Sequence, residues 1–252
     1  MNLHPNEIHL FFANPEEISN VGLLSRYQSL LSDKELRQFP RFHFEQHRHQ
    51  YLVTRALIRS SLSNFYEVEP AEWCFDVNAY GKPSVASSHG LLPVRFNISH
   101  TDGMVMCGIV HDTEIGVDVE DIERVTGDDI ENLYSYFSPL EVAELKRLPK
   151  EKQKQRFFDY WTLKESYIKA RGMGLSLSLS QFRFVFEENR LRDFIVEPEL
   201  SDDSTNWQFW RFALRARYRI AVAVNSNNKN FKISAHHSVP LKSNDSFVLN
   251  FL

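Results

Sequence analysis

The stretch of residues 157–169 constrains the fold of this chain most strongly, because it has helical periodicity but carries a lysine on its apolar side. At about 100° of rotation per residue, Lys164 lies near the middle of an otherwise apolar face, while Glu165 and Lys169 lie together on its flank. The face is formed by five residues, Phe157, Tyr160, Trp161, Tyr167 and Ile168. A lysine in such a place must either extend its ammonium group to water or meet an anion. The pattern therefore predicts a helix from about Lys152 to Arg171, and it leaves the partner of Lys164 open.

Composition is typical of an ordinary globular protein. The chain has 252 residues, 42% of them hydrophobic and 25% charged, which suffices for one large domain or two small ones. Its formal net charge of -4 argues against a general nucleic-acid-binding protein, which usually carries a basic excess. The N-terminus lacks the pattern of a secretory signal, and the longest apolar run, Met104 to Val110, is too short to span a bilayer. We therefore expect a cytoplasmic protein without membrane or nucleic-acid partners, in which Cys74 and Cys107 are reduced.

The predicted strands and helices mix without a regular βα alternation, which favours the α+β class. Helices are expected within Ser32–Leu62, from about 128 to 148 with a second start at Ser138-Pro139, and at 152–171, where Gly172 should end the helix. Strands are expected at Ile8–Phe12, Trp73–Val77, Val94–Ile98, Met104–Val110, Ile115–Glu120, Phe182–Phe186, Trp207–Leu214 and Tyr218–Val224. The short connection after Val110 predicts that residues 104–120 form a hairpin.

Two acids and a glycine share one face of the strand predicted at 115–120. Because side chains alternate along a strand, Gly116, Asp118 and Glu120 point to the same side. The two carboxylates could converge on one hard cation, or they could simply keep an exposed strand face soluble. A glycine within a strand often marks the close approach of another part of the structure, so something is expected to lie against Gly116.

Other polar groups permit more than one interpretation. Glu165 and Lys169 could be an ordinary surface pair on a helix, which would contribute little to stability. The segment Phe96–His100 could be a turn that closes a strand, and because adjacent residues on an extended chain point apart, Ser99 and His100 do not form a nucleophile–base pair. A basic run extends through residues 37–59. It is either a solvated helix face or the counter-charge for a polyphosphate.

The chain resembles the 4′-phosphopantetheinyl transferases of the long Sfp-type branch in the order of its motifs. These run Y-G-K-P, F-N-I-S-H, I-G-V-D-V-E, F-S-P-L-E, W-T-L-K-E-S-Y-I-K-A and G-M-G-L, and together they cover about residues 32–186. The resemblance implies two similar α+β halves in a pseudo-twofold arrangement with the active site between them. It implies an N-terminal half at 1–112 with coenzyme A nucleotide contacts, a C-terminal half at 113–228 with the metal and catalytic residues, and a peripheral tail at 229–252.

The same resemblance implies an activity and a set of site residues. The family moves the 4′-phosphopantetheine group of coenzyme A to a serine hydroxyl of an apo acyl, peptidyl or aryl carrier protein and releases adenosine 3′,5′-bisphosphate. Asp118, Glu120 and Glu165 would hold Mg²⁺, and Glu165 would also take the proton of the carrier serine, directly or through a metal-bound water. Lys169 would stabilise charge that develops on the phosphates. The implied contacts with coenzyme A are Arg41, Arg48, Arg55, Lys82, Ser99, His100, Lys164 and Lys169.

Two rival hypotheses use the same residues. A non-catalytic module that binds coenzyme A or a carrier protein would be expected to lack an acid at 118 or 165, and both acids are present. A metal-dependent phosphoesterase would activate water with the same carboxylates, but it would leave Lys82, Ser99 and His100 without a role. We therefore expect a monomeric transferase, whose physiological carrier protein the sequence does not identify.

Overall fold

The computed structural model describes residues 2–90, 92–124, 127–227 and 229–252. The chain forms two compact units, each with its own hydrophobic core. Unit 1 comprises residues 1–79, 83–113 and 231–248, and unit 2 comprises residues 80–82, 114–230 and 249–252. Both units combine helices with an antiparallel or mixed sheet, which confirms the α+β class.

The core of unit 1 lies between one five-stranded sheet and two of the helices of this unit. The strands β1 (Glu7–Ala13), β4 (Val94–Thr101), β5 (Met104–His111), β11 (Lys232–Val239) and β12 (Ser243–Phe247) pair in the order β12-β11-β1-β5-β4. Only β1 and β11 run parallel to each other among the described pairs. A separate small hairpin is formed by β2 (Phe75–Val77) and β3 (Pro83–Val85).

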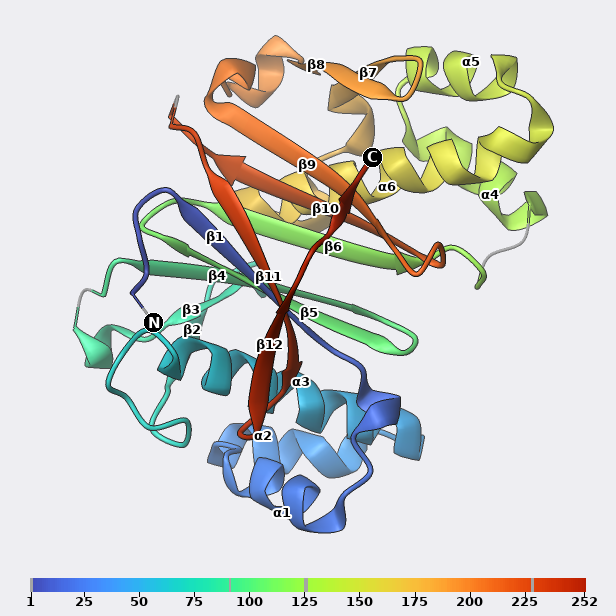
Figure 1. Cartoon of the computed structure of the whole chain (residues 1–252). Coiled ribbons are helices and arrows are strands. Elements are labelled where there is room, and N and C mark those ends of the chain that lie inside the picture. The colour runs from blue at the N-terminus through green and yellow to red at the C-terminus, as the bar shows by residue number, and fades with distance from the viewer. Residues whose placement is uncertain (1, 91, 125–126, 228) are drawn as a thin grey trace. The chain divides into compact units, whose positions relative to one another are not determined.

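The helices of unit 1 are α1 (Val21–Ser29), α2 (Asp33–Gln38) and α3 (Glu45–Ser63). Figure 1 shows α3 running along the sheet, where it packs against β5 and β1. Ser32 and Glu35 form the expected cap at the start of α2. The predicted helical segment is interrupted after α2 by a 3₁₀ turn that contains Pro40, because proline cannot continue the hydrogen-bonding pattern of a helix.

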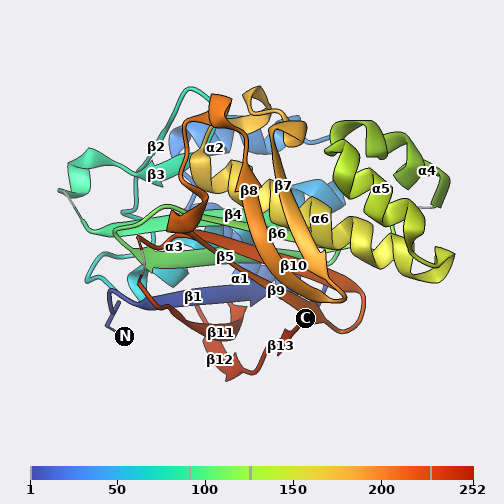
Figure 2. The same cartoon turned by 90° about the horizontal axis from the view of Figure 1, so that it is seen from above.

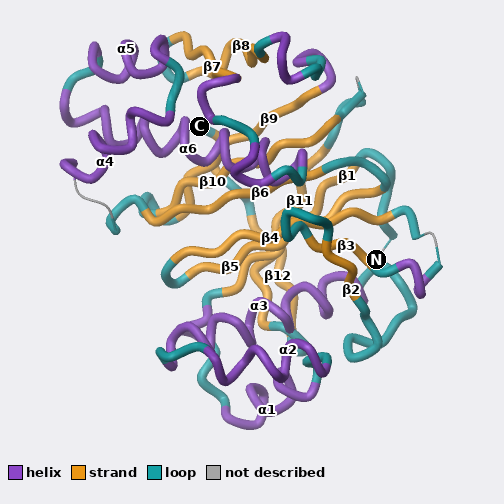
Figure 3. Tube along the Cα trace, turned by 180° about the vertical axis from the view of Figure 1, so that it is seen from behind, coloured by secondary structure: helices purple, strands orange, loops and turns teal. Residues whose placement is uncertain are grey.

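In unit 2 a long helix lies against a four-stranded sheet. The strands β6 (Ile115–Asp121), β9 (Trp207–Leu214), β10 (Tyr218–Asn225) and β13 (Asn250–Phe251) pair in the order β13-β9-β10-β6, and β7 (Phe182–Glu187) pairs with β8 (Arg190–Val196). The helices are α4 (Gly127–Leu133), α5 (Pro139–Arg147) and α6 (Lys150–Arg171). The helix α6 packs against β6 and β10 (Figure 3), and the β7–β8 hairpin lies beside it (Figure 2).

Short 3₁₀ turns connect these elements. They occur at Pro15–Glu17, Phe39–Arg41 and Ser87–His89 in unit 1, and at Tyr134–Tyr136, Gly174–Ser176, Leu179–Gln181, Pro198–Leu200 and Ser204–Asn206 in unit 2. As predicted, α6 ends at Gly172, whose φ of 62° is the left-handed conformation that suits a helix C-terminus. No described helix has the length and hydrophobicity needed to cross a membrane.

Two predictions about the sheets are wrong. Residues 104–120 do not form a hairpin, because β5 pairs on one edge with β4 and on the other with β1, so no edge remains for β6. The hairpin partner of β5 is β4, and the turn between them contains Gly103 at φ 72°. Residues 229–252 are not a peripheral tail either, since they supply β11 and β12 to the sheet of unit 1 and β13 to that of unit 2.

Candidate active site

The close approach of α6 to β6 determines where the acidic side chains of unit 2 lie. A Cβ atom at Gly116 would lie 1.9 Å from the backbone oxygen of Ser166 and 2.4 Å from the backbone nitrogen of Ala170. Only glycine therefore allows the two backbones to come so close. The expected neighbour of Gly116 is thus α6 itself, and the residues that follow on this face of β6 lie next to the helix.

Three carboxylates and one ammonium group meet at this junction. Asp118 and Glu120 leave β6 on the Gly116 face, and Glu165 and Lys169 leave α6 on the side that faces β6. Lys169 Nζ donates a hydrogen bond to Asp118 Oδ1 at 2.6 Å, and Asp118 is only 3% exposed. The structure therefore brings together Asp118, Glu120, Glu165 and Lys169, as predicted from the sequence.

Burial dominates the electrostatics of the glutamates at the junction. Burial raises the pKa of Glu165 to about 7, and the neighbouring Asp118 adds to this effect, although Lys169 opposes it. Burial likewise raises the pKa of Glu120 to about 7, together with the charge of Asp118 and against that of Lys169. Burial and the mutual repulsion of the carboxylates both disfavour their ionised forms, and a cation bound among them would offset both effects.

The residues at the junction fit a divalent cation in charge and in donor type. Carboxylate oxygens are the ligands that Mg²⁺ takes in proteins, usually together with water and phosphate oxygens. Within the described part of the chain, no three His, Cys, Asp or Glu side chains are arranged as a complete metal-binding group. The ammonium group of Lys169 forms an ion pair with Asp118, one of the three acids at the junction.

Lys164 does not belong to this site, and its predicted contact with coenzyme A is wrong. Its side chain is fully buried, and its Nζ lies 2.9 Å from the buried carboxylate of Glu141 on α5. The same nitrogen donates to the backbone oxygens of Leu179 and Phe182, at 2.8 and 2.6 Å. The ammonium group of Lys164 therefore neither reaches water nor faces β6. Its anionic partner is Glu141, an acid inside the core.

Lys82 contacts the end of α6. Its Nζ donates to the backbone oxygen of Ala170 at 2.7 Å and to Glu114 at 2.5 Å. A cation at the C-terminus of a helix interacts favourably with the unpaired carbonyl groups there. The segment of residues 80–82 is thereby tied to unit 2.

The other predicted contacts with coenzyme A belong to unit 1. Arg48 donates to the backbone oxygen of Phe42 at 2.6 Å, and Arg55 Nε lies 3.3 Å from Glu35. Arg41 is exposed at the end of a 3₁₀ turn. Two further residues lie on β4, where Ser99 is buried and His100 is exposed. The basic run is therefore divided between arginines engaged in their own unit and at least one arginine that faces solvent.

Sequence reasoning missed two contacts, one at the junction and one inside the core of unit 2. Trp161 Nε1 donates a hydrogen bond to Glu120 at 3.2 Å, although periodicity assigns Trp161 only to packing. The signal was present, since a partly buried indole N–H usually finds an acceptor. Glu141 was counted only as part of the F-S-P-L-E motif, and its pairing with Lys164 joins two helices, which no local pattern reveals.

Comparison with known proteins points to one family for both parts of the chain. Residues 114–223 match the family described as the 4′-phosphopantetheinyl transferase superfamily, and residues 22–109 match the one described as 4′-phosphopantetheinyl transferase, N-terminal. The chain is 32% identical to the 4′-phosphopantetheinyl transferase HetI of Nostoc sp. over 70% of this chain and 73% of that protein. It is 29% identical to the 4′-phosphopantetheinyl transferase Sfp of Bacillus subtilis over 78% of this chain and 83% of Sfp. A further 4′-phosphopantetheinyl transferase of Bacillus subtilis is 32% identical over 81% of this chain and 86% of its own length.

Proposed function

Because the chain belongs to the 4′-phosphopantetheinyl transferase superfamily, we propose that Asp118, Glu120 and Glu165 hold the Mg²⁺ ion of its active site. The protein is an enzyme that transfers the phosphopantetheine group of coenzyme A to carrier proteins. The observation that supports the metal assignment is the contact of α6 with Gly116, beside which the carboxylates of Asp118, Glu120 and Glu165 interact with one another. When bound, Mg²⁺ would neutralise phosphate oxygens of coenzyme A and so favour attack on the phosphorus.

Glu165 has a second proposed role, as the base that accepts the proton of the carrier serine hydroxyl. Its carboxylate leaves α6 next to Asp118, so base and metal ligands occupy the same small region. A proton acceptor must come within hydrogen-bonding distance of the hydroxyl that it activates. A serine presented to the bound pyrophosphate would meet Glu165 in this region.

Lys169 is proposed to stabilise the charge that develops on the phosphates during transfer. It lies one helical turn after Glu165, and its ammonium group is held in place by Asp118 at 2.6 Å. A cation that is already oriented before the reaction can stabilise the transition state without reorganising.

The nucleotide end of coenzyme A is proposed to contact a set of cations and hydrogen-bonding groups. These are Arg41, Arg48, Arg55, Lys82, Ser99 and His100. Support is strongest for Arg41, whose guanidinium is exposed, because Arg48 and Arg55 already bond within unit 1. We further propose that the enzyme acts as a monomer, since one chain contains both segments that match the family.

The proposal is tested by mass spectrometry of an apo carrier protein incubated with coenzyme A, Mg²⁺ and the enzyme. We expect the carrier to gain the mass of one phosphopantetheine group, and Asp118→Ala and Glu165→Ala to abolish this gain while the variants remain folded. Glu123→Ala is the matched control, because Glu123 is an exposed acid that follows the same strand. Transfer by Glu165→Ala at the wild-type rate would contradict the base assignment. Release of free phosphopantetheine without a carrier would favour a phosphoesterase instead.

A further inference from the structure

An arginine lies directly beside Glu120 in the sheet of unit 2. Arg219 on β10 is the cross-strand partner of Glu120 on β6. Side chains of directly paired residues point to the same face of a sheet, with their Cβ atoms about 5 Å apart. An arginine and a glutamate in such positions would ordinarily form an ion pair.

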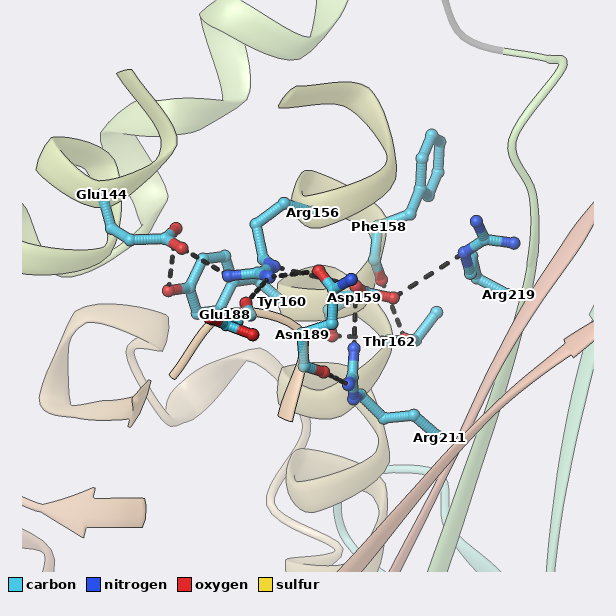
Figure 4. A network of polar contacts seen from close by, with 10 residues as sticks. All are labelled: Glu144, Arg156, Phe158, Asp159, Tyr160, Thr162, Glu188, Asn189, Arg211 and Arg219. Carbon is cyan, nitrogen blue, oxygen red and sulfur yellow. Dashed lines mark hydrogen bonds and ion pairs between the residues drawn. The ribbon is translucent and has the colours of Figure 1, made fainter. Parts of the chain in front are cut away.

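Asp159 on α6 takes the guanidinium group of Arg219 instead. Arg219 Nε lies 3.7 Å from Asp159 Oδ1, and Figure 4 shows this edge of the guanidinium turned toward the aspartate. Asp159 also pairs with Arg211, at 2.8 Å, and with Arg156, at 3.8 Å. In the ranges that the structure describes, no ion pair joins Arg219 to Glu120.

The network around Asp159 is buried, and among the described residues Asp159 is the acid that pairs with all three arginines. Asp159 is 9% exposed, and the three arginines are between 5% and 7% exposed. Glu144 lies beyond Arg156, on the far side of the network from Arg219 (Figure 4). Asp159 is therefore the one carboxylate among the described residues that forms an ion pair with Arg219, whose Nη1 also donates to the backbone oxygen of Ala216 at 3.5 Å.

Glu120 meanwhile receives a neutral donor. The indole N–H of Trp161 bonds to Glu120 at 3.2 Å. Such a donor orients a carboxylate without cancelling its charge, whereas a guanidinium would have to be displaced before a metal ion could bind. Because Arg219 pairs with Asp159 and the indole of Trp161 is neutral, the negative charge of Glu120 remains available to a metal ion.

We propose that Asp159 is a positioning residue that holds Arg219 away from Glu120, so that the Glu120 carboxylate stays available to a divalent cation. This inference rests on the proposed function, in which Glu120 is a metal ligand. Without the charge of Asp159, Arg219 would turn to Glu120 and compete with the metal.

Binding of Mn²⁺ tests this without relying on catalysis. Mn²⁺ takes the oxygen ligands that suit Mg²⁺, and unbound Mn²⁺ can be titrated by electron paramagnetic resonance against folded protein with saturating coenzyme A. We expect Asp159→Asn to weaken Mn²⁺ binding by about tenfold or more, as formation of a close ion pair would. The double variant Asp159→Asn/Arg219→Gln should return to within about twofold of wild type. The matched control Asp159→Asn/Arg211→Gln has the same charge as this double variant but keeps Arg219. Its binding of Mn²⁺ should therefore stay as weak as that of Asp159→Asn.

Each alternative result overturns a distinct statement. If Asp159→Asn is folded and binds Mn²⁺ as wild type does, or if both double variants recover equally, the positioning role is wrong. If Asp159→Asn does not fold, the Mn²⁺ affinity of the single variant Arg219→Gln tests the proposal. The proposal expects its affinity to stay within about twofold of wild type, since Arg219 does not occupy Glu120, and a gain of fivefold or more would overturn the proposal. Failure of the wild-type protein itself to bind Mn²⁺ would refute the metal site and this inference with it.

Discussion

Replacing Lys164 by methionine tests whether this lysine serves the core or the ligand. Methionine has a similar length, so the substitution removes the ammonium group while keeping most of the packing. It leaves Glu141, whose side chain is 1% exposed, without the cation that lies 2.9 Å away in the wild-type protein. Among the described donors, Glu141 would keep the backbone N–H groups of Ser138 and Phe184, at 3.0 and 2.9 Å.

The expected loss is large because one charge of a buried pair would be left without its partner. Breaking such a pair by removing one residue costs about 3 to 5 kcal/mol, whereas removing both charges costs much less. The double variant Lys164→Met/Glu141→Gln should therefore recover about 2 to 3 kcal/mol relative to the sum of the single variants. Since small proteins are stable by about 5 to 15 kcal/mol, the single variant should still fold at low temperature.

Urea unfolding followed by circular dichroism gives the free energies of unfolding for the four proteins of this cycle. At a temperature where Lys164→Met is folded, its KM for coenzyme A should equal that of wild type within about twofold, because Lys164 faces α5 and β7. A loss of stability below about 1 kcal/mol, together with a tenfold rise in KM, would show that the pairing of Lys164 with Glu141 is not its main role. Lys164 would then be a ligand-binding residue after all.

Three further predictions concern the site and its surroundings. The raised pKa of Glu165, about 7 against an ordinary 4.5, means that the folded chain holds this proton longer than the unfolded chain. The associated stability is present below pH 4.5 and lost as pH rises through 7, so Glu165→Gln should exceed wild type in free energy of unfolding by about 1 to 3 kcal/mol at pH 8 and match it near pH 4. If the difference in free energy of unfolding between Glu165→Gln and wild type were the same at pH 4 and pH 8, the pKa of Glu165 would not be raised in the folded chain. Gly116→Ala should destabilise unit 2 by about 2 kcal/mol or more and lower transfer, because its Cβ would collide with backbone atoms of α6, whereas Gly22→Ala, which meets only a side chain at 3.3 Å, should be close to neutral in thermal denaturation. Arg41→Glu should raise the KM for coenzyme A about tenfold with little change in kcat, and Arg37→Glu, a neighbouring exposed arginine, should leave both constants near wild type.

Local patterns in the sequence predict the elements of the site well. The periodicity of residues 157–169 predicts α6 and its end at Gly172, and the alternation at 115–120 predicts β6 with Asp118 and Glu120 on one face. Gly116 even indicates that another segment comes close, since a strand glycine leaves room for a backbone. These predictions succeed because each depends on residues within one helix or one strand.

Pairings between distant segments cannot be predicted from such local patterns. Glu141 meets Lys164 only because α5 packs against α6, and Arg219 meets Asp159 because β10 lies under the same helix. The sequence alone therefore leaves water or a ligand as the candidate partners of Lys164. The wrong hairpin at 104–120 has the same origin, because the partners of β5 depend on β1, which lies about ninety residues earlier.

If the junction of β6 and α6 holds the metal ion through which this chain transfers phosphopantetheine, transfer depends on Mg²⁺ and on the three carboxylates of the junction. The most direct test is the mass of an apo carrier protein after incubation with coenzyme A and the variants Asp118→Asn, Glu120→Gln and Glu165→Gln over a series of Mg²⁺ concentrations. We expect wild type to modify the carrier only when Mg²⁺ is present. The three variants should require at least about tenfold more Mg²⁺ or show no transfer at all. Wild-type transfer in the presence of excess chelator, or an unchanged Mg²⁺ requirement in all three variants, would show that these carboxylates do not hold a catalytic metal ion.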